Sequence, residues 1–188
     1  MVVWILVAVA ALLLLYAIVL YNRLVRLRAL VREAWSGITV QLRRRADLIP
    51  NLVSSVKGYA THERELLEAV TAARAAAGGA KTVGETAQAD AALSGMLGRL
   101  MVVAEAYPEL KADANFRQLQ SELAQTEDEL AGARRYYNAT VRDLNSAVQS
   151  FPAVVVAAPL GFKEEESYAD ADAAIQTAPK VEFGAPAI

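Results

Sequence analysis

Residues 116–152, FRQLQSELAQTEDELAGARRYYNATVRDLNSAVQSFP, carry the most regular pattern in this chain. Apolar or small side chains recur there at spacings of three and four residues, which aligns them on one face of an α-helix. They are Phe116, Leu119, Leu123, Thr126, Leu130, Ala133, Tyr137, Leu144, Val148 and Phe151. Asp113 or Asn115 is placed to begin this helix, and Pro152 to end it. The stretch predicts a long helix that packs against other helices.

An earlier apolar stripe keeps one phase from Trp35 to Ala77. Its members are Trp35, Ile38, Leu42, Ile49, Leu52, Val56, Tyr59, Leu66, Val70, Ala73 and Ala77. Pro50 falls inside this stripe, where it lacks an amide donor and crowds the carbonyl of Ala46. We expect a kink at Pro50 within one continuous helix from Arg23 to Ala77. The alternative is that Asp47 caps a new helix with Pro50 in its first turn.

A shorter helix is expected between these two. Gly78 and Gly79 end the preceding helix, and Thr82-Val-Gly-Glu85 has the spacing of a capping box. The stripe that follows consists of Leu93, Leu97, Leu100, Met101 and Ala104, and Tyr107-Pro108 ends it. Period-two alternation is nearly absent, so the fold class expected is all-α: an N-terminal transmembrane helix followed by an antiparallel bundle of long coiled-coil-like helices.

The first 22 residues contain no charged side chain and would span roughly 30 Å as a helix, the thickness of the hydrocarbon core of a bilayer. Trp4, Tyr16 and Tyr21 suit interfacial anchors. A cleaved signal peptide is the rival interpretation, but it needs a basic start and a small-residue cleavage site, and neither is present. We therefore expect an uncleaved, single-pass anchor.

The orientation of this anchor follows from Arg23, Arg26, Arg28 and Arg32, which crowd its C-terminal flank. The positive-inside rule places the bulk of the protein in the cytoplasm and the short N-terminus outside the cytoplasmic membrane. The same arginines either attract anionic lipid headgroups or serve as a topology signal alone. The domains expected are an anchor at 1–22, a cytoplasmic helical domain at 23–152, and an extended or flexible acidic tail at 153–188.

The expected helix lengths bear on assembly. If the second helix folds back beside a first helix of roughly 80 Å, its end at Pro108 lies near Pro50 and leaves a stalk uncovered. Uncovered apolar stripes usually meet other subunits, so a homo-oligomer is expected. The candidate packing residues are Trp35, Ile38, Leu42, Ile49, Leu130, Tyr137 and Leu144.

Residues suited to catalysis or to holding a metal are scarce. The chain has no cysteine, and His62 is its one histidine, so the His62-Glu63 pair cannot form a self-contained zinc motif. Gly78-Gly-Ala-Lys-Thr82 lacks the glycine before the lysine and the preceding strand of a phosphate loop. No catalytic residue, metal or cofactor is therefore expected.

Two kinds of charged run have simple interpretations. Arg43-Arg44-Arg45 is too short, in a chain of net charge -2, to predict nucleic-acid binding, and ion pairs with acidic helices are expected instead. Glu127-Asp128-Glu129 and Glu164-Glu165-Glu166 lack the spacing of calcium ligands, so they are interpreted as solvated acidic faces.

Taken together, several motifs resemble the LemA family of bacterial membrane-anchored helical proteins. They are YNRLV, EAWSGITVQLRRRADLIPNLVSSVKGYATHE, AEAYPELKADANFRQLQ, SELAQTEDELAGARRYYNATVRDLNSAVQSFP, GF at 161–162 and PKVEF at 179–183. The resemblance implies one transmembrane helix with an external N-terminus and a cytoplasmic bundle. It implies no enzymatic activity, and one related branch is associated with forming magnetosome membranes.

These expectations favour a membrane-anchored scaffold that self-assembles through its long helices and organises or shapes the cytoplasmic membrane. Its partners would be the lipid bilayer, further copies of itself and other membrane proteins, with no nucleic acid. The alternative is an adaptor or regulator of another membrane protein, such as a protease or signalling component.

Overall fold

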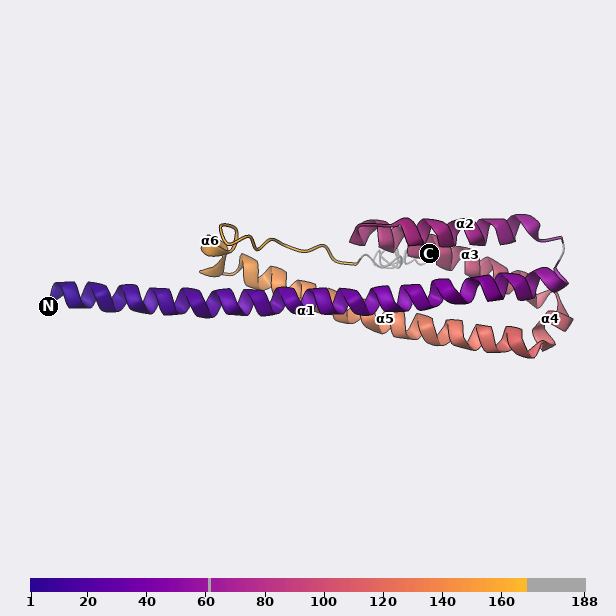
Figure 1. Ribbon diagram of the computed structural model, residues 1–188, viewed down its shortest axis with the longest axis horizontal. Helices are drawn as coiled ribbons and strands as arrows, with labels where there is room; N and C mark the ends of the chain where they lie inside the picture. The colour runs from indigo at the N-terminus through magenta and orange to yellow at the C-terminus, as the bar shows by residue number, and fades with distance from the viewer. Residues whose placement is uncertain (61, 169–188) are drawn as a thin grey trace, which may run out of the picture.

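The computed structural model describes residues 1–60 and 62–168, and within those ranges the protein is a bundle of helices with no strand (Figure 1). The helices are α1 (Val2–Tyr59), α2 (Arg64–Gly79), α3 (Val83–Glu105), α4 (Pro108–Ala112), α5 (Ala114–Gln149) and α6 (Ala153–Ala157). The expected all-α class is confirmed, and so is the long apolar helix at the N-terminus.

α1 continues as a helix through Pro50, so the alternative in which Asp47 begins a new helix is wrong. Because proline has no amide hydrogen, the carbonyl of Ala46 loses its partner in the helix. Arg74 of α2 supplies the missing donor, with its Nε 2.6 Å from the Ala46 oxygen. A side chain from the neighbouring helix therefore completes the hydrogen bonding of α1, whereas the size of any kink at Pro50 stays a prediction.

The prediction of one helix from Arg23 to Ala77 is wrong, because α1 ends at Tyr59 and α2 begins at Arg64. The chain reverses between them, and α2 runs back along α1 (Figure 1). Gly58 weakens the end of α1, since glycine costs about 1 kcal/mol relative to alanine in a helix. The apolar phase persists across the reversal because α2 must also bury one face, and periodicity alone cannot distinguish the two cases.

The remaining helices follow from this reversal. α3 returns in the direction of α1, α4 turns the chain, and α5 runs back antiparallel to α1 (Figure 1). The turn at Pro108 therefore lies at the far end of α1 rather than near Pro50, with the Tyr107 hydroxyl 3.4 Å from Glu63. α1 has 58 residues and α5 has 36, so about 22 residues of α1, about 33 Å, extend beyond α5.

The uncovered part of α1 is thus the apolar N-terminal segment, and the stalk predicted around Trp35 is covered. Five of the predicted subunit-packing residues are buried inside the single chain: Ile38, Ile49, Leu130, Tyr137 and Leu144. Trp35 and Leu42 are half-buried against the same core. These residues pack against other parts of their own chain, and the role predicted for them in contacts between subunits stays a prediction.

Local signals at the helix ends perform well. The Asp113 side chain accepts from the Phe116 amide at 2.8 Å and begins α5, Thr82 and Glu85 form a capping box at α3, and α2 ends at Gly79. Phe151, predicted on the buried stripe of α5, lies beyond its end and is exposed. The stretch at 152–162, expected to be extended, contains the short helix α6.

Buried side chains form two apolar clusters along the rod. The cluster nearer the N-terminal segment joins α1, α5 and α6 and includes Leu24, Ile38 and Leu144. The distal cluster joins α1 to α2, α3, α4 and the start of α5, and includes Leu52 and Phe116. Buried charged side chains, among them Arg45, lie between the two clusters. Their polar contacts join the helices at this level of the rod.

The hydrogen bond from Arg74 should matter only while Pro50 is present. Replacing Arg74 by methionine keeps the stem and removes the donor, so it should cost about 1 kcal/mol of unfolding free energy. In a Pro50→Ala background that cost should largely disappear, because the new amide at position 50 then donates to the Ala46 carbonyl. The measurement is thermal unfolding of the full chain in mild detergent, followed by circular dichroism.

Arg64→Met, which removes an exposed partner of Glu68, is the control and should show no coupling to Pro50→Ala. Additive effects of Arg74→Met and Pro50→Ala would refute the interpretation.

Candidate functional site

Residues 163–168, which we call the strap, leave the loop after α6 and run back along the bundle (Figure 1). Two asparagines of α5 hold the strap by its backbone. Asn145 donates to the Glu165 carbonyl and accepts from the Glu165 amide, both at 2.9 Å. Asn138 does the same at Tyr168, at 3.1 and 2.8 Å. Each amide side chain thus pairs with the strap as a neighbouring strand would.

The spacing of the two asparagines explains why one helix can hold an extended segment. Asn138 and Asn145 are two helical turns apart, a rise of about 10.5 Å along α5. Glu165 and Tyr168 are three residues apart, which is about 10 Å in an extended chain. A further hydrogen bond lies between these two strap residues, because the Tyr137 hydroxyl donates to the Glu166 carbonyl at 2.8 Å. The strap therefore matches the period of the helix beneath it.

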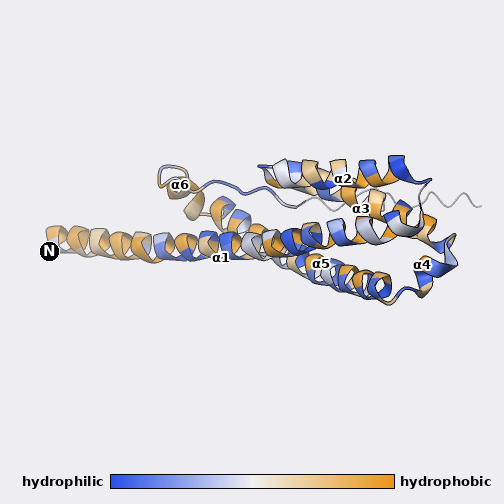
Figure 2. Cartoon of the chain, turned by 45° about the vertical axis from the view of Figure 1, so that its right-hand side comes forward, coloured by the Kyte–Doolittle hydropathy of each residue, from blue (hydrophilic) through white to orange (hydrophobic). Residues whose placement is uncertain are grey.

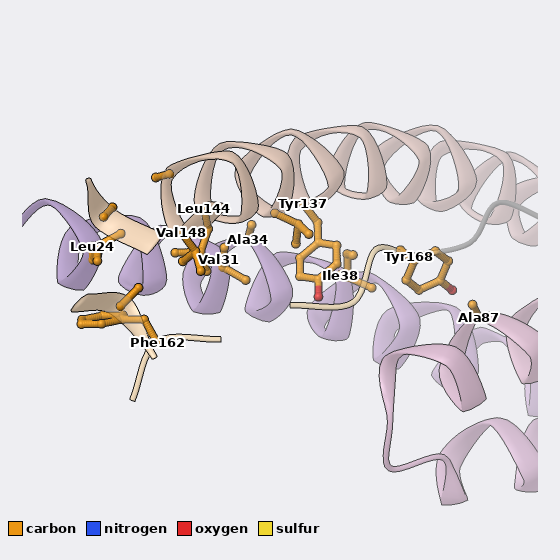
Figure 3. Packing of buried hydrophobic residues seen from close by; sticks show 14 of the residues in the cluster. Leu24, Val31, Ala34, Ile38, Ala87, Tyr137, Leu144, Val148, Phe162 and Tyr168 are labelled. Carbon is orange, nitrogen blue, oxygen red and sulfur yellow. The ribbon is translucent and has the colours of Figure 1, made fainter. Parts of the chain in front are cut away.

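The end of the strap is anchored by a side chain. Tyr168 is buried, and its ring lies 6.4 Å from the ring of Trp35 and 5.3 Å from the Arg134 guanidinium. Figure 3 shows Tyr137 and Tyr168 beside the path of the strap, with Ala87 of α3 beyond Tyr168. The Tyr168 hydroxyl donates to Asp90 Oδ2 at 2.9 Å. This hydrogen bond ties the strap to α3 as well as to α5.

Asp90 is the centre of a buried ionic group that we call the Asp90 cluster: Arg45, Asp90, Glu127, Arg134 and Tyr168. Asp90 is 2% exposed and accepts from Arg45 at 2.7 Å, from Arg134 and from Tyr168. Glu127 lies 3.1 Å from Arg45 and 3.6 Å from Arg134. Two acids face two arginines, so the charge is balanced and each charged group has a partner.

Burial controls the ionisation of both tyrosines that hold the strap. Desolvation, reinforced by the negative charge of Asp90, raises the pKa of Tyr168 well above its ordinary value. Desolvation, together with Glu165 and Glu166, raises the pKa of Tyr137 to about 12. Both hydroxyls therefore remain protonated donors at neutral pH, as their hydrogen bonds require.

The loop just before the strap lies near the end of the apolar segment of α1. Arg28 donates to the Gly161 carbonyl, and its guanidinium lies 4.2 Å from the centre of the Phe162 ring. The Phe162 ring also meets Tyr21 edge-on at 5.7 Å. Gly161 has φ of 76°, a left-handed conformation that glycine adopts without strain, and this turn sends the chain back along the bundle.

The arrangement is suited to holding elements together. The Asp90 carboxylate already accepts three donors, and Ser94 accepts from Arg45 at 2.8 Å. A cavity of about 330 Å³ adjoins the cluster, lined in part by Trp35, Arg45 and Lys81. Across residues 1–60 and 62–168, no three His, Cys, Asp or Glu side chains gather as a metal-binding group.

The predicted site residues have separate locations. Trp4, Tyr16 and Tyr21 are exposed on the apolar part of α1, and Arg23, Arg26 and Arg32 are exposed just after it. Arg28 is the predicted juxtamembrane residue that contacts Gly161 and Phe162, just before the strap. His62 is exposed in the turn before α2. Their roles as anchors or lipid contacts stay predictions, and the part of the tail at 169–188 lies outside the described residues.

Of the charged runs, the expected ion pairing is confirmed for Arg44 and Arg45. Arg44 pairs with Glu129 at 3.3 Å, and Arg45 pairs with Asp90 and Glu127. The interpretation of the first acidic run as only a solvated face is therefore too simple, because Glu127 belongs to the Asp90 cluster.

Sequence reasoning missed Asp90, Asn138, Asn145 and Tyr168. One signal was available for the Asp90 cluster: Arg45 lies three residues after Leu42 and four before Ile49, a position of the apolar stripe. A charge at such a position requires a buried partner. The asparagines gave no such signal, because polar residues beside an apolar stripe are ordinary on a helix surface.

The sequence resembles known proteins over most of its length. The sequence model of the LemA family matches residues 34–183. The magnetosome protein MamQ of Magnetospirillum gryphiswaldense is 25% identical over 174 residues, covering 79% of this chain and 64% of that protein. Protein LemA of Metamycoplasma hominis is 28% identical over 132 residues, covering 69% and 60% respectively. The chain therefore spans less than two thirds of the length of these relatives.

The buried charge of Asp90 should contribute more stability than an exposed ion pair does. Asp90→Asn removes the charge that faces Arg45 and Arg134, and should lower the unfolding free energy by about 3 kcal/mol. Glu129→Gln breaks the exposed pair with Arg44 and should cost less than about 1 kcal/mol. Denaturant unfolding of the full chain in detergent measures both. Equal costs for the two variants would contradict the central role of Asp90.

The buried hydroxyl of Tyr168 should make stability depend on alkaline pH. Because its pKa is raised in the folded state, the folded protein keeps a proton that the unfolded chain releases above about pH 10, so stability should fall as pH rises through that range. Tyr168→Phe should be less stable at neutral pH but lose less stability between about pH 9 and 11. Thermal unfolding across this range measures the difference, with Tyr136→Phe, on the exposed side of α5, as the control. Parallel pH profiles for Tyr168→Phe and the unmodified protein would count against the assignment.

Proposed function

The chain belongs to the LemA family, and from that premise we propose that it is a non-enzymatic structural protein that holds a rigid helical rod on the bacterial cytoplasmic membrane and organises that membrane. A membrane-protein family and one N-terminal apolar helix fit a membrane location. The name of one relative assigns that protein to the magnetosome, which supports a role at membranes.

The observation that carries the proposal is the continuity of α1. The same helix forms the apolar segment and the spine of the bundle, from Val2 to Tyr59. The bundle packs against it as far as Leu24 and Leu20, next to the apolar segment. A protein on a flexible tether transmits no orientation to the bilayer, whereas a continuous helix couples the tilt of the rod to the tilt of the span.

The direction of the rod follows from charge. Arg23, Arg26 and Arg32 are exposed immediately after the apolar segment, and the segment itself contains no charge. The positive-inside rule supports an outside N-terminus and a cytoplasmic bundle.

The proposal includes association of copies of this chain, but through a different surface from the apolar heptad positions that the sequence suggested. The predicted packing residues are occupied within their own chain, so copies would meet at membrane level through the exposed apolar side chains of α1, including Val9 and Leu13. Many copies held at one angle would impose a common geometry on the bilayer.

An adaptor is the second candidate, favoured by an open groove of about 730 Å³ between α1 and α2. Val53 and Leu67 give this groove an apolar floor, and Ala72 and Ala75 allow close approach of a helix. It lies at the end of the rod away from the apolar segment, where another membrane protein's cytoplasmic part would reach it.

Cysteine crosslinking can test where copies meet. The chain has no cysteine, so single-cysteine variants need no background removal. Val9→Cys, in the apolar segment, should form disulfide-linked dimers on oxidation in membranes, and Val40→Cys, exposed on the part of α1 inside the bundle, should not. Imaging of the full chain in lipid vesicles should show rods at one angle to the bilayer. Monomers with random tilts would overturn the scaffold, and a single stoichiometric partner lost on Ala72→Leu would favour the adaptor.

A further inference from the structure

The loop that links α5 to the strap presents a group of exposed apolar side chains. Phe151 is 85% exposed, Val154 50%, Val155 64% and Leu160 46%, and they flank or belong to α6. The opposite side of the same helix is occupied, because Ala153 and Ala157 are buried against α1 and α5. We call Phe151, Val154, Val155 and Leu160 the α6 edge.

The position of the α6 edge along the rod is fixed by contacts. Ala153 and Ala157 belong to the same buried cluster as Leu20 and Leu24 of α1, and Phe162 packs on Tyr21. In Figure 2 the ribbon of α6 has the colour of hydrophobic residues and lies near the end of the hydrophobic N-terminal segment of α1. Since roughly 20 residues of helix cross the hydrocarbon core, Leu20 and Tyr21 lie at its boundary. The α6 edge is therefore at the depth of the membrane surface.

Exposed apolar residues elsewhere in the described bundle are separated from one another. Val40 and Val102, for example, lie on different helices and at different distances from the apolar segment. Single exposed apolar side chains need no explanation, but a group at one point requires a partner. Among the exposed apolar side chains of the bundle, the group beside α6 is therefore the one that calls for a partner.

We propose that the α6 edge is a second membrane contact, which inserts into the cytoplasmic leaflet of the bilayer that α1 spans. This inference rests on the proposed membrane function and names the surface through which the rod acts on lipid. Apolar side chains that enter the boundary between headgroups and acyl chains gain the hydrophobic effect while the backbone stays in the polar zone.

Charge and cavity shape at the same level fit a bilayer as the occupant. Arg23 is exposed and lines one cavity together with Phe151 of the edge, where anionic headgroups would attract its charge. A cavity of about 420 Å³ between α1 and the end of α5 is lined by apolar Leu20 and Phe151 together with polar Arg23 and Ser146. The mixture of apolar and polar lining matches the interfacial zone rather than the hydrocarbon core.

Two contacts constrain the rod more than one does. A single span can rotate about its own axis and tilt, but a second contact beside it fixes which side of the rod faces the bilayer. Because the α6 edge adds volume to one leaflet and the span adds it to both, each copy expands the cytoplasmic leaflet more than the outer one. The rod would thereby couple its orientation to membrane curvature.

Fluorescence tests the insertion directly. Val154→Cys is labelled with an environment-sensitive dye in the full chain, reconstituted in phosphatidylethanolamine and phosphatidylglycerol vesicles that contain spin-labelled lipid. The spin label should quench this probe at least about twofold more than the same dye on the control Val102→Cys, which is exposed on α3 far from the apolar segment. Adding Val155→Asp should reduce the quenching at position 154, whereas Val40→Asp should not, with circular dichroism confirming that both fold.

A probe at Val9→Cys separates the inference from its premise. Quenching at Val9 with none at Val154 would overturn the second contact and leave the anchored rod intact. An absence of quenching at Val9 would overturn the membrane premise itself. Disulfide-linked dimers of Val154→Cys that form in the membrane while its probe stays unquenched would assign the α6 edge to a second copy and overturn lipid insertion.

Discussion

The ionised carboxylate of Asp90 sits between three helices and the strap, and a buried charge of this kind must be paired. Its partners come from three elements: Arg45 from α1, Arg134 from α5 and Tyr168 from the strap. Apolar faces alone tolerate sliding by a turn, because one leucine resembles the next. A carboxylate that needs all three donors does not tolerate such sliding. A shift by one residue along a helix moves each donor by about 1.5 Å and turns it by about 100° around the helix axis. The cluster therefore fixes the register of the bundle.

Register has a consequence at the other end of the rod. With α5 held by Arg134, its last turn falls beside Leu20 and Leu24, where the apolar segment of α1 ends. The same alignment carries α6 to that level and sets Phe162 against Tyr21 and Arg28. The strap closes the arrangement, because it runs from the end of the apolar segment back to Asp90 and is held on the way by Asn145 and Asn138. Both α5 and the strap thus connect the Asp90 cluster to the apolar end of the rod.

Sequence reasoning found what depends on neighbours in the chain. The apolar segment, the cap at Asp113, the capping box at Thr82 and the all-α class are local signals, and the structure agrees with them. It failed where the outcome depends on distant residues. The reversal after Tyr59 preserves the apolar phase, so a continuous helix and a hairpin have the same pattern. That error led to the prediction of an uncovered stalk, which other helices of the same chain in fact cover. The strap was missed because its sequence has no periodicity that would reveal it.

Because the predicted stalk is covered within the chain, a structural role for this family member would not depend on its heptad positions meeting other copies. Long apolar heptads suggested a rod that completes its core with other copies, yet Ile38, Leu130 and Leu144 complete it within one chain. A self-sufficient rod has little apolar surface to offer along the bundle, and its exposed apolar groups are concentrated on the N-terminal segment and beside α6. Since the proposed association and the proposed lipid contact both draw on such surface, they would compete for the same level of the molecule. On that proposal the protein would act on its surroundings at the bilayer, and the bundle would hold that surface at a defined angle.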